Sequence, residues 1–265
     1  MAESKRPGNE GPPTLAAEAQ EWLTQGTHDC VGTEVVLRDP HTPYRLAVRR
    51  EGGKQKGPIT CVSVLTVRGW WFLEARPPKE GVSLVESIQA SPQKLTTSGL
   101  VKKAIRPTLR KRWTITREHD LLAMVCRKAP RGGAGRWARE EDLGDLASYQ
   151  KAYNIERRTE IEANFLDAVR GKRIAVLDHG GRPAAFAKLS GQTGNYACIG
   201  GMYTLPEYRK KGLGKRLTAF LIGELLKEKP AVHLIVDDDN EAAIALYRSL
   251  GFEEVGTCYM AYLKD

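Results

Sequence analysis

The 265-residue chain has no long apolar run and only five cysteines. Its apolar segments fall well short of the ~18–20 residues that a membrane-spanning helix needs, so we expect no membrane partner. Residues 1–13 are polar and hold no apolar core, which predicts a disordered tail rather than a secretory signal. The cysteines are odd in number, far apart and without a CxxC pair, which argues against a disulfide framework or a metal site and favours buried thiols in a cytoplasmic protein. They are Cys30, Cys61, Cys126, Cys198 and Cys258.

The charge of the chain is concentrated in its first half. With 41% apolar and 28% charged residues and a mean hydropathy of −0.41, the chain can bury a core. The net charge is +9, of which residues 1–137 carry +10 and residues 138–265 carry −1. The segment Pro130–Gly135, close to this change, has the glycine and proline content typical of a linker. We therefore predict a basic N-terminal domain over 14–130 and a second domain over 136–265.

A basic, glycine-rich segment connects a predicted strand to a predicted helix. The apolar stretch Tyr196–Thr204 predicts a strand, in which Gly200 and Gly201 indicate a bulge or a close backbone approach. Leucines at helical spacing predict an amphipathic helix over 212–227. Between them, Arg209–Lys215 (RKKGLGK) combines glycines, lysines and the unpaired amides of a helix start, which favours a pyrophosphate site. The spacing matches neither a Walker A loop nor the GxGxxG dinucleotide motif.

A second strand and helix follow directly. The run 231–236 (AVHLIV) predicts a buried strand, and Asn240 after three aspartates suits a helix N-cap. The helix over 241–250 ends at Gly251, as a C-terminal glycine stop predicts. Tyr247 lies on the apolar face of this helix, a position that also suits a core aromatic residue.

Together these segments resemble the acetyl-CoA-binding core of the GNAT acyltransferase superfamily. The resemblance is carried by several elements in the right order: Met202-Tyr203-Thr204, Arg209 to Gly214 (RKKGLG), Asn240 with Tyr247 seven residues later, and Leu250-Gly251-Phe252. A wider similarity covers residues 136–265. The resemblance implies an α/β (α+β) fold, in which helices flank a mixed, mostly antiparallel sheet.

The resemblance also implies a role for each matching residue. Backbone groups of 202–204 would pair with the pantetheine arm of acetyl-CoA, and amides of 209–215 would hold its pyrophosphate. Asn240 would contact the cofactor arm, and Tyr247 would protonate the departing CoA thiolate as the catalytic acid. No metal is implied. The implied cofactor-binding residues are Met202, Tyr203, Thr204, Arg209, Lys210, Lys211, Gly212, Leu213, Gly214, Lys215 and Asn240.

The sequence departs from the superfamily pattern in its general base. Many members carry a glutamate on the fourth or fifth strand, whereas Ile235 and Val236 stand at the end of the corresponding strand here. Asp237, Glu160 or Glu162 could accept the proton through water. Alternatively the amine arrives neutral and needs no base, so we assign none.

The N-terminal half repeats the predicted order of elements, which suggests a degenerate second copy of the same fold in tandem. Where the pyrophosphate turn would lie, the segment 76–81 (RPPKEG) has two prolines that cannot donate amides, so we expect no CoA binding there. We predict strands over 44–50, 58–66, 69–75, 95–97, 113–116 and 121–126, and helices over 82–89 and 100–111.

One predicted helix in this half carries a stripe of positive charge. Lys102, Arg106 and Arg110 repeat every four residues, and no acidic residue lies between Glu86 and Glu118. The stripe is compatible with a solvated surface, an acidic partner, a nucleic-acid backbone or the ribose phosphate of CoA.

We therefore predict an acetyl-CoA-dependent N-acetyltransferase, which moves an acetyl group to a primary amine by direct attack in a ternary complex. The acceptor, a small molecule or a protein, is not specified by the sequence. The alternative is an acyl-CoA-binding or nucleic-acid- or protein-binding regulatory module with little turnover.

Overall fold

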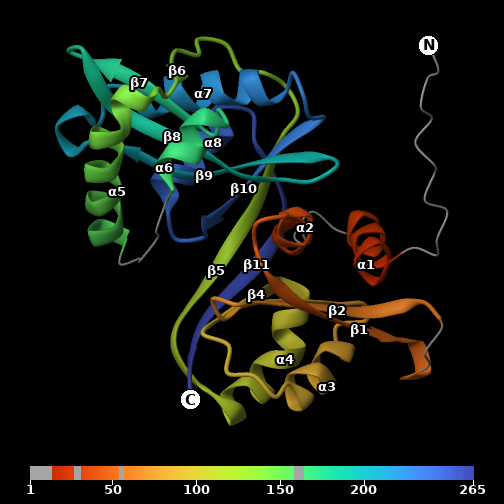
Figure 1. Ribbon diagram of the computed structural model, residues 1–265. Coiled ribbons are helices and arrows are strands. Elements are labelled where there is room, and N and C mark those ends of the chain that lie inside the picture. The colour runs from red at the N-terminus through yellow and green to blue at the C-terminus, as the bar shows by residue number, and fades with distance from the viewer. Residues whose placement is uncertain (1–13, 27–30, 54–56, 158–163) are drawn as a thin grey trace, which may run out of the picture.

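One continuous sheet of 11 strands runs through the whole molecule (Figure 1). The computed structural model describes residues 14–26, 31–53, 57–157 and 164–265. The strand order is β1-β2-β3-β4-β11-β5-β10-β9-β8-β7-β6. The strands are β1 (Tyr44–Arg50), β2 (Ile59–Thr66), β3 (Trp70–Ala75), β4 (Lys94–Ser98), β5 (Thr114–Cys126), β6 (Arg136–Trp137), β7 (Ile174–His179), β8 (Arg182–Gln192), β9 (Tyr196–Thr204), β10 (Ala231–Asp237) and β11 (Glu253–Lys264).

The sheet is mixed and mostly antiparallel, as the sequence predicts. Its parallel pairs are β3 with β4 and β9 with β10, and in each half a helix connects the two parallel strands. The helices are α1 (Leu15–Thr24), α2 (Val31–Arg38), α3 (Glu80–Ser87), α4 (Gly99–Arg112), α5 (Leu143–Arg157), α6 (Phe165–Arg170), α7 (Leu213–Leu225) and α8 (Glu241–Ser249), with short 3-10 turns at Glu51–Gly53, Glu140–Asp142 and Pro206–Tyr208.

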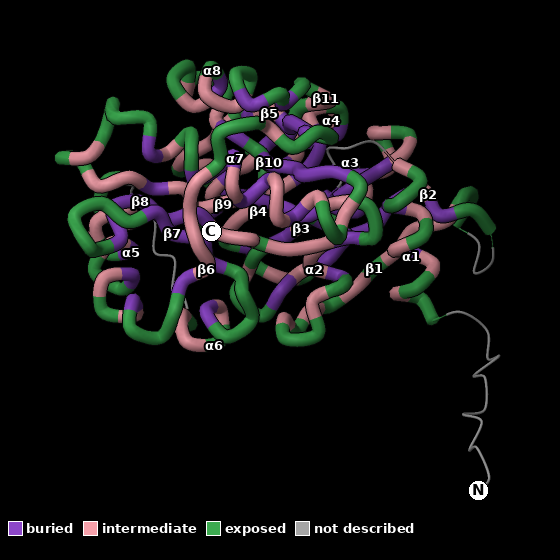
Figure 2. The backbone as a smooth tube through the Cα atoms, turned by 90° about the horizontal axis from the view of Figure 1, so that it is seen from above, coloured by how far each residue is buried: buried purple, intermediate pink, exposed green. Residues whose placement is uncertain are grey.

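Helices cover both faces of the sheet, and buried segments follow the strands between them (Figure 2). On one side, called the α7 face, α7 and α8 pack on Met124 and Leu234, and α3 and α4 pack on Tyr259. On the other side, called the α5 face, α5 and α6 pack on Phe186, whereas α1 and α2 pack on Val64. The helices α1 and α2 were not predicted from the sequence.

The two longest strands lie at the centre of the sheet and correct the sequence prediction. Two strands were predicted over 113–126, but β5 is continuous, since the charged segment 117–120 (REHD) pairs with β11 instead of turning. The closing segment after Phe252 is likewise the single strand β11, which pairs with β4 on one side and β5 on the other. In Figure 1 these strands run between the upper and lower parts of the molecule.

The predicted linker follows β5 and is packed against the second half. The amide of Ala134 donates to the carbonyl of Arg216 in α7 at 3.0 Å. A Cβ atom at Gly133 would lie 2.6 Å from the backbone nitrogen of Phe220, so this glycine permits the close approach. Because β5 precedes the linker and β11 ends the chain, strands from both sides of it alternate in the middle of the sheet. The division into two domains over 14–130 and 136–265 therefore remains a prediction from the sequence.

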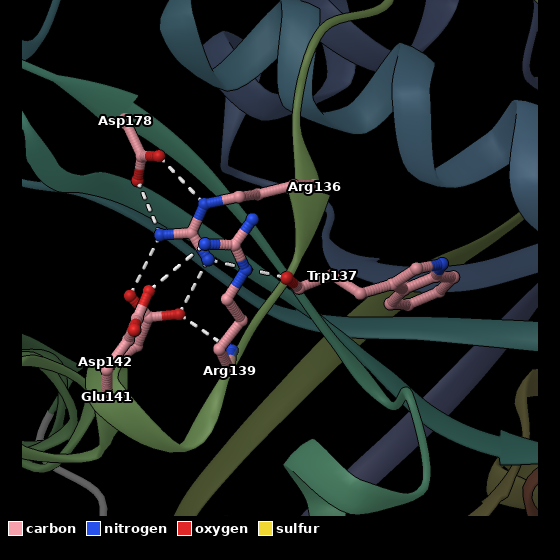
Figure 3. Close-up of polar contacts among 6 residues, drawn as sticks. All are labelled: Arg136, Trp137, Arg139, Glu141, Asp142 and Asp178. Carbon is pink, nitrogen blue, oxygen red and sulfur yellow. Dashed lines mark hydrogen bonds and ion pairs between the residues drawn. The ribbon is translucent and has the colours of Figure 1, made fainter.

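An ion-pair cluster fixes the beginning of the second half (Figure 3). The guanidinium of Arg136 binds both oxygens of Asp142 at 2.7 and 2.9 Å, and both oxygens of Asp178 at 2.8 and 3.0 Å. Asp142 also accepts the amide of Arg139 at 2.7 Å. The cluster thus ties β6 and β7 to the turn from which α5 starts.

The basic stripe on α4 is paired with two carboxylates within the molecule. Lys102 lies 2.6 Å from Asp120, and Arg106 and Arg110 both contact Glu118, at 2.5 and 3.4 Å. Both carboxylates come from β5, on the α7 face. These three side chains therefore have intramolecular partners and form a partly solvated surface, in which Arg110 is 54% exposed, while an external acidic or nucleic-acid partner stays a prediction.

Buried thiols are confirmed for the four cysteines in the described ranges. Cys61, Cys126, Cys198 and Cys258 are free and buried, and burial raises the pKa of Cys61 and of Cys198 to about 12. Cys30 and the predicted tail over 1–13 lie outside the described residues. Within the described ranges, none of the helices is long and apolar enough to cross a bilayer.

Candidate active site

A cavity of about 1140 Å³ opens at the point where β9 separates from β10. On the α7 face it is lined by residues of β9, α7 and α8, among them Leu213 and Tyr247. On the α5 face it is lined by residues of β5, β11 and α5, among them His119 and Tyr262. The cavity therefore connects the two faces through the opening in the sheet.

The opening results from the short pairing between two parallel strands. In the described sheet, β9 pairs with β10 only from Tyr196 to Cys198, whereas β10 pairs with β5 as far as Asp237. Beyond that point the backbone of 200–204 faces the cavity without a strand partner on this side. The predicted bulge is confirmed, because the register with β8 shifts near Gly201, whose φ is +59°.

The loop before α7 turns its backbone amides toward this opening. Lys210 and Gly212 have φ values of +60° and +74°, and a Cβ at Gly212 would meet nothing within 4 Å. Within the described residues, the amides of 210–215 donate no hydrogen bond, so they and the start of α7 can receive an anion.

Arg209 differs from the rest of the predicted loop. Its amide donates to the carbonyl of Pro206 at 3.2 Å, so this amide is already in use. Its guanidinium donates to the carbonyl of Thr204 at 3.0 Å and forms an ion pair with Glu156 of α5 at 2.6 Å. Arg209 therefore holds the loop against β9 and α5, and the cradle of free amides starts at Lys210.

Tyr247 reaches the opening from α8. Its hydroxyl lies 3.9 Å from Sδ of Met202, and its ring packs edge-on against Phe252 with centroids 5.6 Å apart. The Oδ1 atom of Asn240 accepts the amide of Ala243 at 3.2 Å, which confirms the predicted N-cap. The phenol is thus held beside the open backbone of β9.

The α5 face of the cavity carries polar groups that the sequence did not indicate as site residues, beside Asp237, which it did. Nδ1 of His119 lies 3.3 Å from Oδ1 of Asp237, at the end of β10. Lys94, Arg117 and Glu156 line the same cavity. Arg117 and His119 stand two residues apart on β5, but this alternation is visible only once β5 is known to be one strand.

The predicted site residues are largely brought together. All of them line the cavity except Lys211, whose Nζ lies 5.1 Å from the ring centroid of Tyr208. Of the possible bases, Asp237 lines the cavity, whereas Glu160 and Glu162 lie outside the described residues. The described ranges hold no group of three or more His, Cys, Asp or Glu side chains arranged to bind a metal.

Comparison with protein families and curated proteins finds acetyltransferases. A family model described as the acetyltransferase (GNAT) family matches residues 119–252, about half of the chain. The [ribosomal protein bS18]-alanine N-acetyltransferase of Escherichia coli strain K12 is 38% identical over 110 residues, 39% of this chain and 73% of that protein. Mycothiol acetyltransferase of Kocuria rhizophila is 43% identical over 72 residues, 26% of this chain, and the chain spans only 24% of that protein's length.

Solved structures extend the likeness over almost the whole chain. A tandem GNAT protein from the clavulanic acid biosynthesis pathway has a TM-score of 0.52 and 16% identity, covering 93% of this chain and 94% of that one. At this identity the likeness concerns the fold alone.

Proposed function

Because the chain belongs to the acetyltransferase (GNAT) family, we propose that it is an N-acetyltransferase that uses acetyl-CoA and a primary amine. The observation that carries this proposal is the opening between β9 and β10. It exposes strand backbone at one end of a cavity, places free amides and lysines at the other end, and has a phenol in between.

Acetyl-CoA fits the α7 side of this cavity. Amide groups of its pantetheine arm would pair with the open backbone of 202–204, much as a strand would. Its pyrophosphate would accept hydrogen bonds from the amides of 210–215, with Lys210 and Lys215 adding positive charge. Gly214 allows α7 to lie close to β9, since a Cβ there would be 3.3 Å from Oγ1 of Thr204.

The reaction needs a neutral amine and an acid for the leaving group. The amine nitrogen attacks the thioester carbonyl, the C–N bond forms, and the C–S bond breaks as the thiolate leaves. A base takes the extra proton of the substrate ammonium before the attack. After the attack, the Tyr247 hydroxyl gives its proton to the thiolate, and the acylated nitrogen loses its own extra proton to solvent. The tyrosinate and the base then return to their starting states by exchange with solvent. Both substrates occupy the cavity together, so the transfer is direct.

We assign the base to His119, held by Asp237. The imidazole is on the α5 face, opposite the CoA side, so an amine entering from this face would meet it before the thioester. The carboxylate 3.3 Å from Nδ1 orients the ring and stabilises the imidazolium. Asp237 is one of the possible bases that the sequence indicated. In this assignment His119 takes the proton of the amine, and Asp237 acts through His119.

Calorimetric titration with acetyl-CoA tests the donor site. A glutamate at Gly212 would put a negative charge and a strained φ at the amide cradle, so Gly212→Glu is expected to abolish micromolar binding. Gly223→Glu is the matched control, because this position lies in the same helix and a Cβ there meets nothing within 4 Å. Equal binding by the wild type and Gly212→Glu, or no binding by the wild type, would contradict the proposal.

Steady-state kinetics tests the assigned acid. Tyr247→Phe keeps the packing on Phe252 and removes the proton, so we expect kcat to fall by about 10²–10⁴-fold with the affinity for CoA unchanged. A parallel loss of affinity would make Tyr247 a packing residue instead.

The assigned base requires a different comparison. His119→Gln should lower kcat/KM by about 10²-fold or more for a strongly basic amine, which is protonated in solution. For a weakly basic amine that is already neutral, the loss should be several-fold at most. The same loss with both amines would remove His119 from the proton path.

A further inference from the structure

Two cations lie side by side on the α5 face of the cavity. Lys94 of β4 is in register with Tyr262 of β11, which is in register with Arg117 of β5. Nζ of Lys94 lies 5.5 Å, and Cζ of Arg117 5.6 Å, from the centroid of the Tyr262 ring. Both side chains line the cavity and are half-buried. Two positively charged side chains therefore lie near one aromatic ring at the wall of the cavity.

This arrangement disfavours the charged form of Lys94 unless an anion is present. Burial lowers the pKa of the Lys94 ammonium, and the charge of Arg117 lowers it further. Its described neighbours are aromatic, with Nζ 4.9 Å from the ring centroid of Trp70. No carboxylate in the described part of the chain forms an ion pair with Lys94.

On the opposite face of the same strand, two cations are paired with carboxylates. There, Lys102 and Arg106 of α4 meet Asp120 and Glu118 of β5 at 2.5–2.6 Å. Successive side chains of β5 thus alternate between acidic residues that pair with α4 and the basic residues Arg117 and His119, which point into the cavity. Among the described residues Lys94 has no carboxylate partner, and a ligand can supply that negative charge.

The position of the pair relates it to the acceptor rather than to CoA. Arg117 stands two residues from His119 on β5, a distance of about 7 Å along the strand. The amide cradle of 210–215 instead lies at the start of α7, on the other face of the sheet. A group bound between Lys94 and Arg117 would therefore be close to an amine at His119 and on the opposite face from the cradle.

We propose that the acceptor is a small amine that carries an anionic group a few bonds from its nitrogen, and that Lys94 and Arg117 bind this group. The proposal rests on the proposed function. A guanidinium offers a carboxylate or a phosphate two parallel hydrogen bonds, and an ammonium beside it adds a point charge. An amino acid or an aminoalkyl phosphate has this chemistry, whereas a plain alkylamine or an amino acid amide does not.

The test compares acceptors that differ only in the anionic group. Rates of CoA release are measured with short α-, β- and γ-amino acids, with their amides, and with aminoethyl and aminopropyl phosphates. The wild type is compared with Lys94→Gln and, as a matched control, with Lys103→Gln. Lys103 lies on the exposed side of α4, away from the cavity.

We expect anionic acceptors to exceed their neutral counterparts in kcat/KM by at least tenfold. Lys94→Gln should lower kcat/KM for them by about 10- to 100-fold, mainly through KM, and leave the neutral acceptors and the affinity for acetyl-CoA unchanged. Lys103→Gln should behave as the wild type. Whether carboxylates or phosphates give the higher rates decides which anion the pair accepts.

Several results would overturn the proposal. They are a preference for neutral amines, an equal effect of Lys94→Gln on both classes, and no turnover or CoA-dependent thermal stabilisation with any anionic amine. Loss of CoA affinity in Lys94→Gln would assign the pair to the donor instead. Failure of the wild type to bind acetyl-CoA would be a failure of the proposed function, which calorimetry detects separately.

Discussion

The two carboxylates that bind Arg136 allow a stability prediction in which the exposed one serves as the control for the buried one (Figure 3). Asp142 and Asp178 bind the same guanidinium at nearly equal distances, but the Asp142 side chain is 4% exposed and that of Asp178 is 38% exposed. Removing a partner from a buried pair costs about 3–5 kcal/mol, whereas an exposed pair contributes about 0–1 kcal/mol. Arg136 keeps one carboxylate in either variant, so the lower end of the first range applies.

Asp142→Ala is therefore expected to lower the free energy of unfolding by about 3 kcal/mol, and Asp178→Ala by less than about 1 kcal/mol. Urea unfolding followed by circular dichroism measures both values, provided that the m-value stays constant. Equal losses in the two variants, or a loss below about 0.5 kcal/mol for Asp142→Ala, would refute the argument from burial.

The same carboxylate predicts an acid dependence. Hydrogen bonds from Arg136 hold the pKa of Asp142 below its usual range. The unfolded state therefore takes up the proton first, and this contribution is present above the unfolded pKa and is lost as the pH falls through the folded one. Asp142→Ala should lose less stability than the wild type over that acidic range. Since α5 starts beside the cluster and carries Glu156 to the cavity, the variant should also raise the KM for the acceptor.

Three further predictions concern stability. Hydrogen bonds from Arg106 lower the pKa of Glu118 to about 2. Because Glu118 is partly exposed, Glu118→Gln should lower the free energy of unfolding at pH 7 by only about 1–2 kcal/mol. Urea titrations should show that the difference between the wild type and the variant shrinks as the pH falls from 4 toward 2. Burial lowers the pKa of Lys188 to about 8, so the unfolded state binds more protons than the folded state between pH 8 and 10. The free energy of unfolding of the wild type should therefore rise as the pH rises through this interval. Lys188→Met should make this rise smaller. Gly133→Ala would place a Cβ atom 2.6 Å from the backbone nitrogen of Phe220. Calorimetry should therefore show a Tm lowered by several degrees. An unchanged Tm would mean that the linker is not packed on α7.

The arrangement of the proposed donor side could be predicted from the sequence because its parts are local. The strand 196–204, the loop with Gly212 and the two following helices are consecutive in the chain, and each leaves its own signal in periodicity, glycine placement or capping. Residues that are close in sequence and joined by short turns have few ways to be placed relative to one another. The positions of Met202, Asn240 and Tyr247 around one cavity follow from that restriction.

The arrangement of the proposed acceptor side depended on tertiary structure. Lys94 and Arg117 meet on either side of Tyr262 because β11 lies between β4 and β5, whereas Asp237 reaches His119 because β10 pairs directly with β5. A strand shifted by one residue turns every side chain to the other face, so whether Arg117 or Glu118 faces the cavity is decided by register with β11. The residues next to Arg117 in the chain do not determine that register. The loop that we propose to bind the pyrophosphate was therefore indicated by the sequence itself, whereas the side chains opposite it were brought together by long-range strand pairing.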